Sequence, residues 1–269
     1  MKPLFTVLFL LVALVSCEKP ISSDDSEEVE SDGNLIVSIT NTELSTTRLN
    51  FALYDMSGTR VKQVNQQVGN AGFGTASFQV DKGDYFMVVV AHSSNGNPTM
   101  ASPKKIQFTN AQGFTETFLY SGNVTVDDER KEIGVALQRI VSLCRFVLMD
   151  DYPADVVKMR FYYTGGSGAF DATTGLGCVN SKQSVFFDIS SGQKTFDLYT
   201  FLHALEGTIH LLVTAYDAND NVLNERTFDV PLTQNKMTTL TGSFFSDSSS
   251  TTSTITINTG WNGEYHLTF

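Results

Sequence analysis

Short apolar runs separated by turn residues extend along the chain from residue 33 onward. Residues 35–39, 49–54 and 85–91 are rich in β-branched, aliphatic and aromatic residues, a composition typical of strands. Residues 75–80 alternate between apolar and polar positions, as in a strand with one buried face, and residues 60–68 alternate weakly, as in an edge strand. Further strands are predicted at 105–108, 115–120 and 123–126.

A second series of apolar runs follows, with turn residues at similar intervals. Helical periodicity is almost absent, and only residues 197–205 have a pattern that fits one or two helical turns. Near the end, Asn262-Gly263 is a strong signal for a hairpin turn before the last strand. The whole pattern predicts an all-β fold. The strands predicted in this series are 133–139, 141–149, 156–163, 184–189, 209–216, 224–230, 237–245, 253–258 and 264–269.

The length of the β-rich part predicts two domains. Residues 33–269 are too many for one ordinary β-sandwich and suit two sandwiches of roughly 100 residues each. The apolar runs 83–92 and 207–216 both follow a glycine turn, and this weak repeat supports two similar domains. The charged cluster 127–132 marks the predicted boundary. The predicted domains are an N-terminal β-sandwich at 33–131 and a C-terminal β-sandwich at 132–269.

The N-terminus has the anatomy of a secretory signal. Lys2 provides a basic start, and the apolar run 4–15 is shorter than the roughly 20 apolar residues of a transmembrane helix. The run ends in Leu14-Val15-Ser16-Cys17, which resembles a bacterial lipobox. The resemblance implies that residues 1–16 are a lipoprotein signal peptide, cut just before Cys17, and that the Cys17 thiol carries an acyl group such as palmitate. A plain signal peptide with an incidental cysteine is the alternative, which the Val15-Ser16-Cys17 order does not favour.

An acidic segment follows this cysteine. Without residues 1–16 the chain carries 17 basic and 29 acidic residues, and half of the resulting negative charge lies in residues 18–32. That segment contains several serines and almost no apolar residues, so residues 17–32 are predicted to form a disordered tether. The segment also resembles the export tag of surface lipoproteins in Bacteroidota. A solvated spacer is the plainer interpretation, and the two are compatible.

Charge and motifs argue against several classes of function. The net charge of −11 and the absence of a basic stripe make nucleic acid an unexpected partner. No Gly-x-Ser-x-Gly elbow is present, and His92, His203, His210 and His266 are scattered among predicted strands. We expect packing or surface roles for these histidines, no metal site, no cofactor and no enzymatic activity.

Two polar stretches and two cysteines have structural interpretations. Gly165-Gly166-Ser167-Gly168 lacks the Lys-Ser/Thr ending of a phosphate loop and is predicted to be a flexible hairpin loop. Residues 217–221 predict an Asx-rich turn rather than a calcium loop. Cys144 lies in an apolar run, which predicts a buried thiol. Whether Cys144 and Cys178 form a disulfide stays open, because the sequence does not show the distance between them.

Several motifs, taken in their order along the chain, resemble the FimB-type fimbrial anchor subunits. Val135-Ala136-Leu137-Gln138-Arg139, before the apolar strand around Leu143, is similar to the opening of that family's C-terminal domain. Residues 230–242 with the following Phe244-Phe245 are similar to its penultimate region. Further similar features are Ile255-Thr256-Ile257 with Trp261 near the end, and Leu53-Tyr54-Asp55, Gly58 and Gly83-Asp84-Tyr85 in the family's transthyretin-like first sandwich.

The resemblance implies two tandem transthyretin-like sandwiches in a lipoprotein subunit of type V pili of Bacteroidota. Such a subunit anchors the fibre to the outer membrane or forms part of the fibre at the cell surface. Its partners would be the outer membrane, through the lipid on Cys17, and other fimbrial subunits. Subunits of this family assemble when a strand from one subunit fills the open edge of a neighbour's sandwich.

Alternatives to this interpretation remain. Arg48, between two predicted strands, is a candidate site for the protease that trims stalk subunits, or a surface arginine in a turn. The chain can also be a non-polymerising surface lipoprotein that binds glycan or protein ligands, which an aromatic platform on one face would favour. Trp261 is the single tryptophan, and Tyr162 and Tyr163 are further candidates for such a platform. An envelope hydrolase is the least supported alternative.

Overall fold

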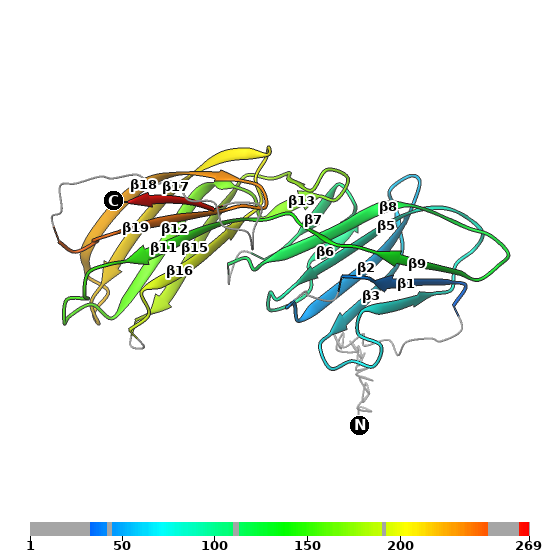
Figure 1. Cartoon of the computed structure of the whole chain (residues 1–269), viewed down its shortest axis with the longest axis horizontal. Coiled ribbons are helices and arrows are strands. Elements are labelled where there is room, and N and C mark those ends of the chain that lie inside the picture. The colour runs from blue at the N-terminus through cyan, green and yellow to red at the C-terminus, as the bar shows by residue number, and fades with distance from the viewer. Residues whose placement is uncertain (1–32, 42–44, 110–112, 190–191, 247–263, 269) are drawn as a thin grey trace, which may run out of the picture.

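The computed structural model describes residues 33–41, 45–109, 113–189, 192–246 and 264–268. These residues form strands and turns with no helix among them, which confirms the all-β prediction. In this described part, therefore, no helix has the length and apolarity needed to cross a membrane. The strands form two β-sandwiches that lie end to end along the long axis of the molecule (Figure 1).

The N-terminal sandwich packs a five-stranded sheet against a three-stranded sheet. Their facing sides form one apolar core, in which Val37, Phe51 and Val89 are fully buried. The edge position predicted for residues 60–68 is confirmed, because β3 ends the larger sheet. The larger sheet has the order β10 (Gln138–Arg139), β8 (Thr117–Val126), β5 (Gly83–His92), β2 (Arg48–Asp55) and β3 (Arg60–Gln67), and the smaller has the order β4 (Thr75–Phe78), β1 (Leu35–Ile39) and β9 (Lys131–Val135).

The C-terminal sandwich packs two four-stranded sheets around an aromatic core. Phe146 lies at its centre, with ring centroids of Phe161, Phe196, Phe228 and Phe244 at 5.4, 6.5, 5.9 and 6.3 Å. One sheet has the order β15 (Ser181–Asp188), β12 (Lys158–Gly166), β17 (Glu206–Tyr216) and β18 (Val222–Thr233). The other has the order β16 (Thr195–Thr200), β11 (Ser142–Leu148), β19 (Met237–Gly242) and β20 (Glu264–Thr268).

The two sandwiches share one topology. In each, the first strand pairs in parallel with a late strand, β1 with β9 and β11 with β19. The strands β5 and β17 contain the two similar apolar runs 83–92 and 207–216. They occupy equivalent central positions, β5 between β2 and β8 and β17 between β12 and β18. The two sandwiches differ at two edges, because β10 lies beside β8 only in the first sandwich and β20 lies beside β19 only in the second.

A fifth sheet joins the two sandwiches. It has the order β14 (Leu176–Gly177), β13 (Ala169–Asp171), β7 (Lys105–Gln107) and β6 (Thr99–Ser102), so β7 and β13 pair across the junction. Beside this sheet, Phe108 stacks on Phe201 at 5.9 Å between ring centroids. Strands β9 and β10 pair with β1 and β8, so the pairing of the first sandwich continues to Arg139. The division of the chain into domains after Lys131 stays a prediction.

The prediction of one or two helical turns within residues 197–205 is wrong. Residues Thr195–Thr200 form β16, which pairs antiparallel with β11. Phe196 and Leu198 are both buried and lie opposite Phe146 and Cys144. Burial of every second residue is typical of a strand with one face against a core. The segment is therefore a strand and not a helical turn.

The glycine stretch 165–168 is also different from the prediction of a flexible hairpin loop. Gly165 and Gly166 end β12, and Ser167 is fully buried and forms a bridge with Phe201. A Cβ atom on Gly166 would lie 1.9 Å from Thr200 Oγ1, so only glycine fits this close approach. The glycines therefore permit tight packing at the junction.

Candidate functional site

The predicted anchoring residue is not among those that the structure describes. Cys17, the signal peptide 1–16, the tether 17–32, the strand predicted at 253–258 and Trp261 all lie outside the described residues. The described chain starts at Gly33, directly before β1. The candidate sites that remain are strand edges and one exposed sheet face.

Strand β1 fills the middle of the smaller sheet in the first sandwich. Its side chains Leu35 and Val37 are fully buried in the core. The strand pairs antiparallel with β4, with Leu35 opposite Phe78, and in parallel with β9, with Val37 opposite Ile133. Without β1, the core would be open between β4 and β9, so β1 completes this sandwich.

The outer side of β9 is an open edge, because β9 pairs only with β1 among the described strands. The N–H of Lys131 donates to Asn34 O at 2.8 Å, and Val135 O accepts from the N–H of Thr40 at 2.9 Å. Backbone direction alternates along a strand, so Glu132 and Gly134 direct their backbone groups away from β1. The edge therefore presents unpaired backbone groups to a possible extra strand.

The equivalent edge of the second sandwich carries β20. This strand pairs in parallel with β19 over Met237–Glu264 through Thr241–Thr268. In Figure 1, β20 is the red arrow beside β19. The two sandwiches thus show one edge occupied and the other open at the same place in the topology.

Arg48 lies in a different place from the one predicted. It is the first residue of β2, not a residue between strands, and pairs with Gln67 on one side and His92 on the other. A protease can cut a strand only after the strand has separated from its neighbours, so cleavage sites concentrate in exposed loop tips. The position therefore favours the surface arginine over the processing site.

The adjacent tyrosines Tyr162 and Tyr163 are separated by the alternation of β12. Tyr163 is buried and its hydroxyl donates to Tyr199 O at 2.8 Å. Tyr162 lies on the outer face, where the guanidinium of Arg160 is 5.0 Å from its ring centroid. One of the two tyrosines is thus available on the surface and the other is part of the core.

His92 has a packing role, as the sequence predicts. Its ring is fully buried, contacts Phe108 edge to face, and lies with Nε2 2.8 Å from Asn50 Oδ1. The N–H of Ser94 donates to Nδ1 at 3.1 Å, so Nδ1 carries no proton and Nε2–H donates to Asn50. Burial, with the nearby charge of Arg48, lowers the pKa of His92 to about 4.

This environment predicts an acid-dependent loss of stability. The pKa of His92 is lower in the folded protein than the usual 6.5, so its stabilising contribution is complete above pH 6.5 and is lost as the pH falls toward 4. Between pH 7.5 and pH 5 the free energy of unfolding should fall by about 2 kcal/mol from this group. Urea titrations at both pH values should show the loss in the wild type and in the control His203→Gln, an exposed histidine, but not in His92→Gln. An equal pH effect in His92→Gln would contradict this assignment.

The remaining candidate groups have structural roles. Cys144 and Cys178 are both free, so no disulfide joins them, and burial raises the pKa of the Cys144 thiol to about 12. The Asx-rich turn is confirmed, because Asp217 Oδ1 accepts from the N–H groups of Asn219 and Asn221, both at 2.8 Å. The hydrogen bond from the Asn221 side chain, together with these backbone bonds, lowers the pKa of Asp217. Among the described residues, no group of His, Cys, Asp and Glu is arranged to hold a metal ion.

Comparison with solved structures finds similar chains at low sequence identity. A candidate adhesin from Bacteroides ovatus is 16% identical, with a TM-score of 0.53, over 73% of this chain and 82% of the other. A fimbrial assembly protein from Parabacteroides distasonis is 12% identical, with a TM-score of 0.42, over 80% and 91%. The fimbrial anchor protein Mfa2 from Porphyromonas gingivalis is 14% identical, with a TM-score of 0.41, over 71% and 80%. The first similarity shows the shared β-sandwich fold.

Among curated proteins, no sequence matches this chain. One family model does match, over residues 97–268, which is more than half of the chain. The match includes the junction sheet and the whole second sandwich. The chain belongs to DUF6562, a family of unknown function.

Proposed function

We propose that this protein is a lipid-anchored subunit of a cell-surface fimbria. Acyl chains on Cys17 hold it in the outer membrane, and it joins other subunits by β-strand addition. The fold it shares with the candidate adhesin from Bacteroides ovatus is compatible with a role at the cell surface. The role is structural and adhesive, without a catalytic step.

The observation that carries this proposal is the difference between the two sandwiches. A strand lies on the outer edge of β19, and nothing described lies on the equivalent edge of β9. Because the two sandwiches share one topology, an edge that accepts a strand in one is suited to accept one in the other. The added strand would satisfy the outward backbone groups of Glu132 and Gly134 by main-chain hydrogen bonds.

The test is a substitution that removes one outward donor and leaves the β1 pairing intact. Proline at residue 132 lacks an N–H, and the N–H of Glu132 is directed away from β1. In fibres purified from the native cell surface, Glu132→Pro should be depleted at least about tenfold, whereas Glu132→Gln should be present at the wild-type level. Thermal unfolding of both purified variants checks that each folds.

The possible results separate the parts of the proposal. Equal incorporation of a folded Glu132→Pro would rule out strand addition at β9. Absence of the wild-type chain from fibres, with unchanged fibre number and length when the protein is deleted, would overturn the fimbrial function itself.

A second candidate function is ligand binding by a surface lipoprotein that does not polymerise. It is favoured by exposed aromatic and cationic side chains on the outer face of the β15–β12–β17–β18 sheet. This face lies on the opposite side of the sheet from the core, so it is compatible with either function.

A further inference from the structure

We propose that the outer face of the β15–β12–β17–β18 sheet binds a carbohydrate that carries carboxylate groups. This inference adds a ligand-binding site to the proposed fimbrial subunit. It rests on the proposed function only in that the site must lie at the cell surface. The residues that form it are called the aromatic row: Tyr162, Arg160, Phe186, Lys158 and Tyr216.

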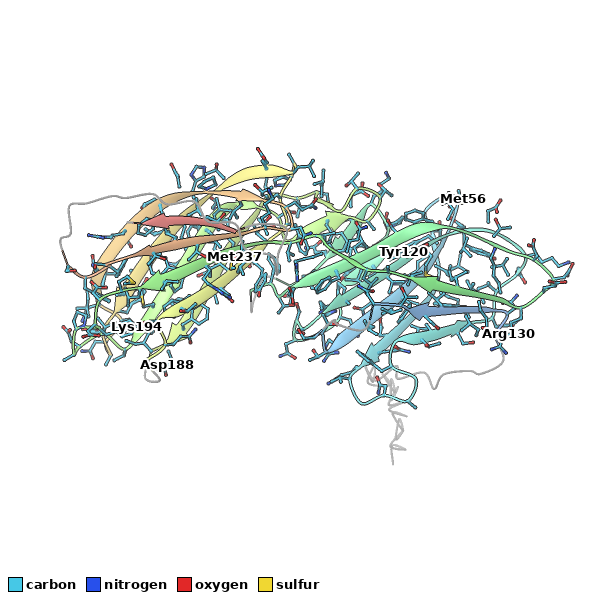
Figure 2. The ribbon with its side chains drawn as sticks, in the orientation of Figure 1. Met56, Tyr120, Arg130, Asp188, Lys194 and Met237 are labelled. Atoms are coloured by element: carbon cyan, nitrogen blue, oxygen red, sulfur yellow. The ribbon has the colours of Figure 1, made fainter. Side chains whose placement is uncertain are left out.

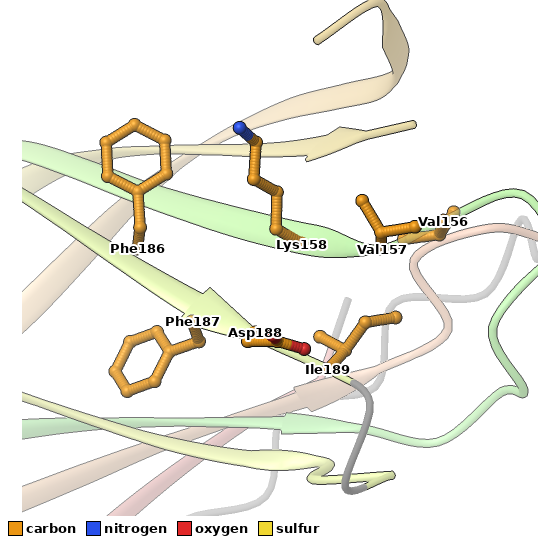
Figure 3. A pocket seen from close by; sticks show the side chains of 7 residues that line it. All are labelled: Val156, Val157, Lys158, Phe186, Phe187, Asp188 and Ile189. Carbon is orange, nitrogen blue, oxygen red and sulfur yellow. The ribbon is translucent and has the colours of Figure 1, made fainter. Parts of the chain in front are cut away.

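Strand alternation and register bring the aromatic row to one face. On β12, Met159, Phe161 and Tyr163 are buried in the core, so the residues between them face outward. Arg160 lies opposite Phe186 of β15, and Lys158 lies opposite Tyr216 of β17. Figure 3 shows Phe186 and Lys158 rising on the same side of the sheet, whereas Phe187 points the other way.

Rings and cations alternate along the aromatic row. The Arg160 guanidinium is 5.0 Å from the Tyr162 ring centroid and 5.8 Å from that of Phe186. The Lys158 ammonium is 5.8 Å from the Phe186 centroid and 5.6 Å from that of Tyr216. These contacts fix the orientation of both cations before any ligand arrives, which reduces the entropy lost on binding.

The two cations differ in their partners. Lys158 forms an ion pair with Asp220. Arg160 donates from Nε to Ser184 Oγ at 2.9 Å, and no carboxylate of the described residues pairs with it. Asp188, on the outer face of the adjacent strand β15, lies opposite Lys158 and not opposite Arg160. Glu225, on the outer face of β18, is two strands away and accepts from Thr214 Oγ1 at 3.0 Å. The two terminal nitrogens of Arg160 can therefore take a ligand carboxylate as a bidentate pair.

An apolar surface lies next to this cation. The side chain of Phe186 is 56% exposed, and it borders a groove of about 500 Å³. Val156, Val157 and Ile189 give the groove an apolar lining, with Lys158 and Asp188 as its charged groups (Figure 3). Asp188 lies at the lower edge of the second sandwich, away from the junction (Figure 2). The groove is therefore remote from the first sandwich.

These features match an acidic sugar better than an acidic peptide. A sugar ring has an apolar C–H face that packs on an aromatic ring, and a uronate unit carries its carboxylate on the same ring. The hydroxyls of Tyr162 and Tyr216 bond no other described residue, so both can bond ligand hydroxyl groups. The aromatic row borders the groove, which residues of the core side such as Phe187 also line, whereas a peptide with apolar side chains would need several pockets on the outer face.

Titration calorimetry of the mature protein with oligogalacturonate tests the inference. The uncharged galactose oligomer of the same length should bind at least about tenfold more weakly, because it lacks the carboxylate that Arg160 would hold. Arg160→Gln should weaken oligogalacturonate binding about tenfold or more, and Phe186→Ala should weaken it several-fold. The control Arg60→Gln removes an exposed arginine of the first sandwich and should leave binding unchanged. Sialyllactose, added separately, distinguishes host-type acidic sugars from uronate polymers.

Three results would overturn the proposal. No binding of either acidic sugar, or equal losses in folded Arg160→Gln and Arg60→Gln, would exclude the aromatic row as an acidic-sugar site. Polyglutamate binding as tightly as oligogalacturonate would replace the carbohydrate with an acidic peptide. Arg160→Gln should still enter fibres at the wild-type level, so failure of this inference is distinguishable from failure of strand addition.

Discussion

Cells that carry Cys17→Ala are expected to lose the protein from their outer membrane almost completely. Each buried CH₂ of an acyl chain contributes roughly 0.8 kcal/mol, and stable anchoring takes two chains rather than one. Without the thiol no chain can be attached at this position. The described part of the protein offers no helix that could replace the anchor. Membrane fractionation and labelling with radioactive palmitate should both show the loss.

A second cysteine provides the control for this experiment. Cys178 is exposed and free, so Cys178→Ala removes an accessible thiol without disturbing the core. This variant should stay in the membrane fraction and keep its label. Palmitate incorporation that persists in Cys17→Ala would refute lipidation at residue 17.

Replacement of Phe146 by alanine should destabilise the second sandwich by about 3–5 kcal/mol. Phe146 is fully buried and its ring contacts four other phenylalanine rings, so the truncation leaves a cavity that strands on both sheets cannot easily close. Urea unfolding followed by circular dichroism measures the change in the free energy of unfolding.

The matched control is another phenylalanine of the same sandwich. Phe186→Ala removes a ring that is 56% exposed, and it should lower the free energy of unfolding by about 1 kcal/mol or less, mainly through lost cation–π contacts. A loss of less than about 1 kcal/mol in Phe146→Ala would show that Phe146 is not central to the packing.

The strands with a clear period or a continuous apolar run are the ones that the sequence predicts well. Residues 85–91 lie in the middle of β5, where strands pair on both sides and both faces are covered. Residues 209–216 lie in β17, which also pairs on both sides, although its outward side chains, such as the exposed His210, are not covered. Full burial selects apolar residues at successive positions, so the composition of such strands is unmistakable.

Other strands depend on contacts that a local pattern does not contain. Thr99–Ser102 and Ala169–Asp171 are short, and they are strands because β7 and β13 pair across the junction of the two sandwiches. The strands predicted at 115–120 and 123–126 are one strand, β8, because Ser121 and Gly122 stay paired with β5. A polar pair in mid-strand resembles a turn unless the neighbouring strand is known.

The candidate sites were predictable to different degrees. Tyr162 was a candidate platform residue, but Phe186 was not, because the run Val185-Phe186-Phe187 is apolar on both faces and suggests burial throughout. Only the register with Arg160 shows that Phe186 faces outward. The open edge of β9 needed the topology of both sandwiches. Lipidation of Cys17 stays a prediction.

The sheet that contains β7 and β13 gives the molecule a mechanical property. A pull applied between β1 and β20 must cross from one sandwich to the other, and there it meets strand pairing as well as the covalent connection. The stack of Phe108 on Phe201 resists bending at the same place. In the proposed fimbrial subunit, this junction would carry tension through paired strands and would resist bending between the two sandwiches.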